Sequence, residues 1–210
     1  MEKSEFLLWS FFILGGFISG GIMYCELVPK KTVKKDIQAL SPDGNPGASN
    51  VFINCGIPLG MLCLMLDILK GCLPVFCAER LLDANNIRFA FVMIAPVLGH
   101  ALAPLNRFHG GKCIATAFGV MIAVLPISRI GLVLAGLYIL FSTLIKINPN
   151  RIRSIVTFSL FCLISVAVLT YTKKYSLAFG CAGISIIAVL RHTKLLSTVP
   201  ENEMLTKKES

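Results

Sequence analysis

Long apolar segments follow one another along nearly the whole sequence and leave only short polar stretches between them. A helix that spans a bilayer needs ~20 apolar residues. Charged residues make up 15% of this chain, whereas soluble domains carry about 25%, so a soluble domain and a disordered chain are both excluded. We expect an all-α integral membrane protein with about seven transmembrane helices. The apolar segments are residues 6–28, 51–77, 89–105, 114–125, 130–147, 155–171 and 176–190.

These segments leave no room for a soluble domain. We expect residues 1–196 to form a single polytopic membrane domain and residues 197–210 to form a polar cytosolic tail. The N-terminus lacks the positive region and the Ala-x-Ala site of a signal peptide, so the first segment is expected to remain as a span. If the N-terminus lies outside, the cytosolic loops hold more than twice as many basic residues as the external ones. The prediction is therefore N-terminus out, C-terminus in.

The formal net charge is +9. The basic residues are divided among short loops, with no basic helix or aromatic platform, which favours contact with anionic membrane lipids over nucleic acid. The predicted topology places the loops 29–50, 106–113 and 146–154, and the tail from Arg191, on the cytosolic side. These stretches could together build one site at the membrane surface. The oligomeric state is left open.

The cysteines lie mostly within or beside apolar segments, without a Cys-x-x-Cys pair or a neighbouring pair of histidines. This pattern predicts packing residues rather than a zinc site or a disulfide framework, so neither a metal nor a cofactor is expected. The sequence also lacks His-Glu-x-x-His, Gly-x-Ser-x-Gly and the His-x-x-x-x-Asp pair of another acyltransferase type. Several enzyme classes are thereby excluded.

Glycines spaced four residues apart occur in the first two apolar segments, at Gly16 and Gly20 and at Gly56 and Gly60. Small residues at this spacing allow two helices to approach closely. We therefore expect both pairs to serve helix packing.

A loop rich in glycine and asparagine precedes the second apolar segment and contains Gly44, Asn45, Gly47 and Asn50. Successive backbone amides ahead of a helix can bind an anion. The alternative is a tight turn that leads into the helix, with Asn50 as its cap. Both interpretations remain open at this point.

Two charged residues, Asp67 and Lys70, lie inside the second apolar segment. Their spacing of three places both on one helix face. Charges inside a membrane helix are costly and are commonly functional or paired with each other. Lys70 is therefore a candidate phosphate-binding residue, and the alternative is an ion pair that stabilises helix packing.

The stretch from Gly99 to Thr116 is the part of the sequence richest in candidate anion-binding and reactive residues. Gly110 and Gly111 free the backbone immediately before Lys112, at the start of the next apolar segment. Backbone donors, a helix N-terminus and an ammonium group together suit a phosphate. The stretch does not match a Walker A loop. The alternative is a connecting loop with a lysine that sets topology.

Further basic groups precede the sixth apolar segment and follow the seventh. Arg151, Arg153 and Ser154 are candidates for anion binding, or they mark the edge of the membrane. His192 could transfer a proton or lie at the interface only.

In their order and spacing, these stretches resemble the bacterial acyl-phosphate:glycerol-3-phosphate acyltransferases, and the resemblance covers nearly the whole chain. Residues 44–50 (Gly-Asn-Pro-Gly-Ala-Ser-Asn) are similar to the end of that family's first motif. Residues 67–71 (Asp-Ile-Leu-Lys-Gly) are similar to its Asp-x-x-Lys-Gly. Residues 108–116 (Phe-His-Gly-Gly-Lys-Cys-Ile-Ala-Thr) are similar to its Gly-Gly-Lys motif, and 191–192 to its closing Arg-His.

The resemblance implies a transferase of phospholipid biosynthesis in the bacterial cell membrane. It implies transfer of an acyl group from acyl phosphate to glycerol 3-phosphate, which forms lysophosphatidic acid, with the active-site loops facing the cytosol. On this basis we expect catalytic roles for Lys112, His192 and Asn45. We expect substrate or phosphate binding by Gly44, Gly47, Asn50, Lys70, Gly110, Gly111, Arg151 and Ser154.

The chain departs from the family's pattern in its loops and at its end. The differing positions are Gln38, Asp43, His109, Cys113 and Leu195. These departures leave open a divergent paralogue with another acceptor or little activity. The alternative functions are a small anion or metabolite transporter and a non-catalytic membrane partner.

Overall fold

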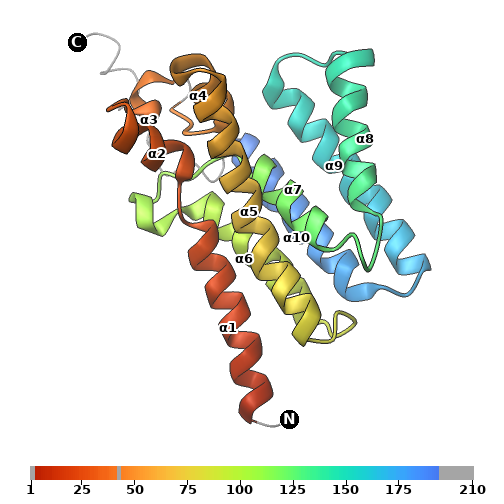
Figure 1. Cartoon of the computed structure of the whole chain (residues 1–210). Coiled ribbons are helices and arrows are strands. Elements are labelled where there is room, and N and C mark those ends of the chain that lie inside the picture. Colours follow the sequence, from red (N-terminus) through yellow and green to blue (C-terminus); the bar gives the residue numbers. More distant parts are fainter. Residues whose placement is uncertain (1–2, 42–43, 194–210) are drawn as a thin grey trace.

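The computed structural model describes residues 3–41 and 44–193, and every regular element in these two ranges is helical (Figure 1). The elements are α1 (Lys3–Gly20), α2 (Tyr24–Thr32), α3 (Ile37–Leu40), α4 (Ala48–Cys55), α5 (Ile57–Leu81), α6 (Arg88–Leu102), η1 (Pro104–Asn106), α7 (Ile114–Ala123), α8 (Gly131–Ile139), η2 (Leu140–Leu144), α9 (Asn150–Tyr171) and α10 (Tyr175–His192). The turn η1 is a 3₁₀ helix and η2 is a π-helical turn. The expected all-α class is therefore confirmed.

Two of the expected continuous segments are each broken into two helices. Segment 6–28 is interrupted after α1, and α2 continues at an angle of 48° to it. Segment 51–77 is interrupted between α4 and α5 at Gly56, whose φ of 86° lies in the left-handed region that glycine adopts without strain. Gly56 therefore ends a helix, and the expectation that it packs two helices together is wrong.

Candidate spans within the described residues fall into three groups. Helices α5, α9 and α10, and α6 together with η1, are each long and apolar enough to cross a membrane. Helices α1 and α2 together form a bent fifth candidate, whereas α7 and the pair α8–η2 are apolar but shorter. Large apolar side chains such as Phe11, which is 67% exposed, cover the outside of α1. These surfaces suit an integral membrane protein.

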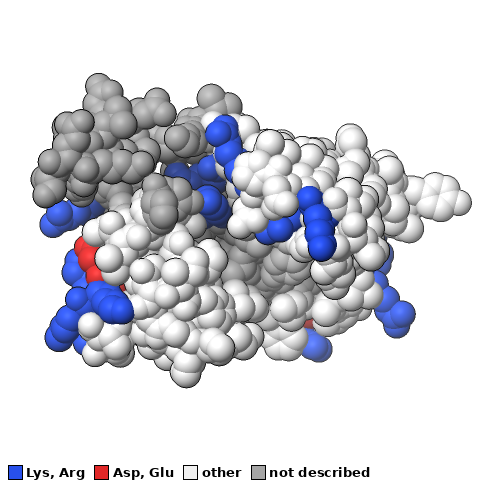
Figure 2. Space-filling model, turned by 90° about the horizontal axis from the view of Figure 1, so that it is seen from above, with Lys and Arg blue, Asp and Glu red and all other residues white. Residues whose placement is uncertain are grey.

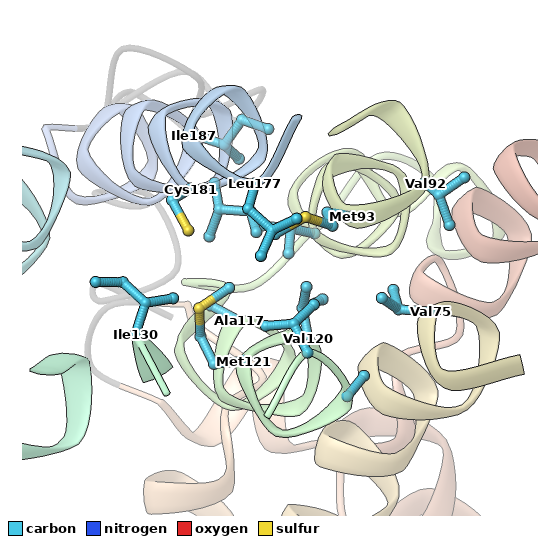
Figure 3. Close-up of a cluster of buried hydrophobic side chains, with 14 of the residues drawn as sticks. Val75, Val92, Met93, Ala117, Val120, Met121, Ile130, Leu177, Cys181 and Ile187 are labelled. Carbon is cyan, nitrogen blue, oxygen red and sulfur yellow. The ribbon is translucent and has the colours of Figure 1, made fainter. Parts of the chain in front are cut away.

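The core lies where α5, α6, α7 and α10 meet (Figure 3). Val75, Met93, Val120 and Leu177, one from each helix, are completely or almost completely buried there. Close backbone approach makes this packing possible, because a Cβ atom at Gly119 of α7 would lie 2.0 Å from the Ile68 carbonyl oxygen of α5. The arrangement holds the ends of α6, α7 and α10 together.

The helices bring widely separated loops to one end of the molecule. In Figure 1 the short helices α2, α3 and α4, the connection between α6 and α7, and the end of α10 all lie at the upper end, whereas α1 begins at the lower end. The upper end is called the loop face below. The loop face carries the loops and helix ends that contain most of the described residues that the sequence singled out for chemistry. Lys70 lies within α5 instead.

Candidate active site

The centre of the loop face is the connection between α6 and α7, residues 103–113. Helix α6 ends at Ala103, whose φ of 44° is left-handed, and three further residues of the connection also have positive φ. The Gly111 amide then returns to the end of α6 and donates to the His100 carbonyl oxygen at 3.1 Å. The connection is thus folded back against α6 and forms a compact loop.

The two glycines of this loop occupy positions where no side chain fits. A Cβ atom at Gly110 would lie 2.0 Å from the Ala101 carbonyl oxygen, and one at Gly111 would lie 2.2 Å from Nε2 of His100. Gly110 and Gly111 are therefore required by packing. Since the Gly111 amide is engaged by His100, we do not assign that amide to an anion.

Lys112 follows the glycines directly and stands two residues before α7 begins. The side chain of Lys112 is partly buried, and the intervening Cys113 is buried with a left-handed φ of 66°. The Cys113 thiol lies 3.5 Å from the Val97 carbonyl oxygen. Burial raises the pKa of this thiol to about 12, against the opposing effect of Arg191 and Lys70. Cys113 therefore remains a neutral thiol beside the loop and adds no negative charge.

The end of α10 lies against the same loop. The Nε atom of Arg191 donates to the Gly111 carbonyl oxygen at 3.0 Å, and its Nη2 atom donates to the Gly110 carbonyl oxygen. Arg191 and Gly111 are 80 positions apart in the chain. Arg191 was not among the residues that the sequence predicted for the site.

His192, the next residue, is almost completely buried, with 3% of its surface exposed. Its Nδ1 atom lies 2.7 Å from the Ala188 carbonyl oxygen. A carbonyl oxygen only accepts, so Nδ1 carries the proton and the neutral ring keeps a lone pair on Nε2. Nε2 is buried and has no hydrogen-bond partner among the described residues. The positive charges of Lys112, Arg191 and Arg151 all act on this ring.

Arg151 and Ser154 lie at the start of α9. Nη2 of Arg151 is 3.4 Å from the Thr193 carbonyl oxygen, which joins this helix to the end of α10. Ser154 is buried, and its hydroxyl lies 2.8 Å from that of Tyr138 on α8. Arg153, between them, has a buried Nε without a hydrogen-bond partner in the described part of the chain. The sequence marked Arg153 with Arg151 and Ser154 as a candidate for anion binding, but it did not single out Tyr138.

The glycine-asparagine loop forms a separate cluster at the same face. The Asn45 carbonyl oxygen accepts from the Asn50 side chain at 2.8 Å, from the Gly47 amide at 2.9 Å and from the Ser41 hydroxyl at 3.1 Å. Gly47, not Asn50, is the cap of α4, so the expected capping role of Asn50 is wrong. Gly44 has a left-handed φ of 62°. The loop is a tight turn whose hydrogen bonds orient Asn45 and Asn50.

Lys70 lies within α5, and its charge acts on the nearby Cys113 of the loop between α6 and α7. Its ammonium nitrogen is 2.7 Å from Asp67 and 2.6 Å from the Ile22 carbonyl oxygen. The Lys70 and Asp67 side chains are only 1% and 4% exposed. Cys25 donates to the other Asp67 oxygen at 3.1 Å. These contacts favour the structural alternative, an ion pair that stabilises the break between α1 and α2, over phosphate binding by Lys70.

Three of the positions that depart from the family's pattern, Gln38, His109 and Cys113, lie within the described residues. The backbone N–H of Gln38 donates to the buried Glu26 carboxylate at 3.0 Å, and this hydrogen bond joins α3 to α2. The His109 amide donates to the Asn106 carbonyl oxygen at 2.9 Å. Asp43 and Leu195 lie outside the described residues.

The loop face is strongly basic. Figure 2, which looks down on it, shows Lys and Arg side chains bordering a hollow, with few acidic side chains in view. Within the described ranges, no cluster of three or more His, Cys, Asp or Glu residues could hold a metal ion. The site therefore offers positive charge, helix ends and the imidazole of His192 for chemistry on anions.

Known proteins with similar sequences share one activity. Residues 10–199 match the family model described as glycerol-3-phosphate acyltransferase. The chain is 31% identical over 205 residues to the glycerol-3-phosphate acyltransferase of Halalkalibacterium halodurans, which covers 94% of this chain and 96% of that protein. It is 39% identical over 112 residues to glycerol-3-phosphate acyltransferase 1 of Thermotoga maritima, a match that spans 54% of that relative.

Two solved structures have a similar fold. One is a crystal structure of PlsY (YgiH), an integral membrane glycerol 3-phosphate acyltransferase, in its glycerol 3-phosphate form. It has a TM-score of 0.75 and 26% sequence identity, and the match covers 94% of this chain and 92% of that one. The lysophosphatidic acid form of the same protein has a TM-score of 0.73 and 25% identity. With nine-tenths of its length matched by the family model, the chain belongs to the glycerol-3-phosphate acyltransferase family.

Proposed function

We propose that this protein transfers the acyl group of an acyl phosphate to the 1-hydroxyl of glycerol 3-phosphate. The hydroxyl oxygen forms the new ester bond, the bond between the acyl carbon and the phosphate oxygen breaks, and lysophosphatidic acid and phosphate are released. The observation that carries this proposal is the Gly-Gly-Lys loop, held between α6 and α10 with His192 beside it. Acyl phosphate is already activated, so no covalent nucleophile is required.

The residues of the loop face divide the chemistry between charge and proton transfer. Lys112 and the N-terminal end of α7 stabilise the phosphate or the oxyanion that develops on the acyl carbonyl. Nε2 of His192 accepts the proton that the attacking hydroxyl loses. Arg151 adds positive charge from the start of α9, and Asn45 and Asn50 orient substrate from the neighbouring turn. Ser154 supports the same site through its hydroxyl.

The position of the loop face also supports a proposal for how the helices cross the membrane. We propose seven crossings, formed by the five longer candidate spans and the two shorter apolar helices, with the N-terminus outside and the loop face in the cytosol. Short helices cross by tilting or by local thinning of the bilayer. An acyl chain can then lie in lipid while both phosphates meet basic residues at the surface.

The assay for this function uses protein-containing membranes supplied with acyl phosphate and glycerol 3-phosphate. Wild-type protein is expected to form lysophosphatidic acid. Lys112→Ala is expected to lower kcat by at least ~10²-fold, because it removes charge that stabilises the transition state. Lys31→Ala, which removes an exposed lysine of α2, is the matched control and should leave turnover unchanged.

Other outcomes separate the alternatives. Unchanged turnover in Lys112→Ala would contradict the role of Lys112. Uptake of glycerol 3-phosphate into sealed vesicles without acyl product would indicate a transporter, and the absence of both activities would indicate a non-catalytic partner. The engagement of Lys70 with Asp67 and Ile22 already argues against a charged pathway through the bilayer.

A further inference from the structure

We infer that Arg191 is a positioning residue that acts through Lys112, by holding the peptide groups of Gly110 and Gly111 in one orientation. This inference rests on the proposed function and adds a residue to it. Its basis is a pair of contacts from one guanidinium to two consecutive carbonyl oxygens of the loop. Arginine suits such a position because its planar fork presents several donors in fixed directions.

The first peptide group, between Gly110 and Gly111, is held from both sides. Its carbonyl oxygen accepts from Arg191, and its amide donates to the His100 carbonyl oxygen at 3.1 Å. The C=O and N–H bonds of a trans peptide point in opposite directions. The arginine on α10 and the end of α6 therefore clamp this group between them, and its plane cannot turn without breaking a hydrogen bond.

The second peptide group, between Gly111 and Lys112, is held by Arg191 through its carbonyl oxygen at 3.0 Å. By the same geometry, the Lys112 amide points away from the guanidinium. The clamp therefore sets the direction of the backbone at the residue that carries the ammonium group. Gly111 precedes this peptide group and leaves the backbone free to adopt other conformations, so an external restraint is needed.

The contacts of Arg191 separate it from a substrate ligand. Two carbonyl oxygens of the loop already accept from its Nε and Nη2 atoms, and the side chain reaches them from the end of α10. His192 follows on the same helix, and the charges of Arg191 and Lys112 both act on its ring. One residue thus aligns the loop of α6 and α7 with the histidine of α10. Misplacement of a catalytic group by about 1 Å lowers rates by ~10²-fold.

A double-mutant cycle tests this role. Arg191→Gln is expected to lower kcat by about 10²-fold while changing the KM for glycerol 3-phosphate less than about threefold. In the Lys112→Ala background, the same substitution should lower kcat less than about twofold further, because two residues that act as one unit are not additive. Arg129→Gln, an exposed arginine between α7 and α8, is the matched control and should be additive.

Either of two results would overturn the inference. A raised KM with unchanged kcat would make Arg191 a substrate ligand, and fully additive losses would make its role independent of Lys112. If Arg191→Gln does not assemble in membranes, Arg191→Lys takes its place, since it keeps the positive charge but cannot hold both carbonyl oxygens. The same cycle criteria then apply.

The rate of hydrogen exchange at the Gly111 amide tests the clamp independently of catalytic activity. In Arg191→Lys, the Gly111 amide is expected to exchange faster than in wild type, whereas Arg129→Gln leaves it unchanged. Unchanged exchange would contradict the clamp even if the enzyme is active. Faster exchange in a protein that forms no lysophosphatidic acid would instead retain the clamp and reject the proposed function.

Discussion

At the scale of single residues, the Asp67–Lys70 pair shows how burial decides between two roles for one charge. The sequence left phosphate binding and ion pairing both open. The structure places both side chains among protein groups, with the Ile22 carbonyl oxygen and the Cys25 thiol as further partners. A buried ion pair of this kind leaves an uncompensated charge if one partner is removed, so we interpret the pair as structural.

This interpretation predicts the effect of removing the pair. Lys70→Met is expected to lower the free energy of unfolding by about 3–5 kcal/mol, because Asp67 is left buried without a counter-ion. The double variant Asp67→Leu/Lys70→Met should recover most of that loss. Thermal unfolding in detergent measures both. A double variant that is stable but has a KM for glycerol 3-phosphate raised more than about tenfold would restore the phosphate-binding role.

Single residues also mark what could not be predicted. Lys112 was predicted because an ammonium group after two glycines suits a phosphate, and both Lys112 and His192 match motifs of the family that the sequence resembles. Arg191 was noted only as part of the closing Arg-His pair, without a role of its own. Its contacts with Gly110 and Gly111 depend on α10 packing beside α6, which no local pattern encodes.

At the scale of helices, close backbone contacts determine the packing. Gly20 and Gly99 lie where α1 meets α6, and a Cβ atom at either would come within 2.0 Å of a carbonyl oxygen of the other helix. The four-residue spacing in the sequence identified Gly20 on α1 but not Gly99 on α6. Gly71 and Gly119 perform the same function between α5 and α7, although no four-residue spacing marks them.

Substitutions at glycine therefore have effects that depend on position. Gly119→Ala should lower the free energy of unfolding by about 1–3 kcal/mol, since its Cβ would overlap the Ile68 carbonyl oxygen. Gly15→Ala is the matched control, because nothing lies within 4 Å of the added atom. It should leave stability unchanged or slightly raised through helix propensity. Thermal unfolding of both variants in the same detergent compares them, and equal losses would contradict the packing argument.

At the scale of the whole molecule, the loops of chemical interest share one face because successive helices run in opposite directions (Figure 1). The basic side chains around the hollow of that face agree with a surface for anionic substrates (Figure 2). The broken segments at 21–23 and at Gly56 also belong to this scale. Each break separates a short helix, α2 or α4, from the long apolar helix next to it in the sequence, and both short helices lie at the loop face (Figure 1).

The proposed orientation is testable with reporter fusions. A green fluorescent protein fused to the C-terminus is expected to fluoresce, because it folds in the cytosol, whereas alkaline phosphatase at the same position should be inactive. Alkaline phosphatase inserted after Asn85, between α5 and α6 at the opposite end, should be active. The reverse pattern would contradict the placement of the loop face in the cytosol.

The sequence alone determined the helical membrane class of the protein and predicted the loops in which we propose its chemistry. Long apolar segments require helices, because a bilayer leaves no other partner for backbone hydrogen bonds, and scarce charge in short loops marks where chemistry is available. The tertiary structure decided which of those charges are engaged. It assigned Lys70 to an ion pair, placed Arg191 on the glycine loop and left Nε2 of His192 without a protein partner among the described residues. The physical reason is that burial and hydrogen bonding depend on which helices pack together, and these contacts join residues that are far apart in the chain.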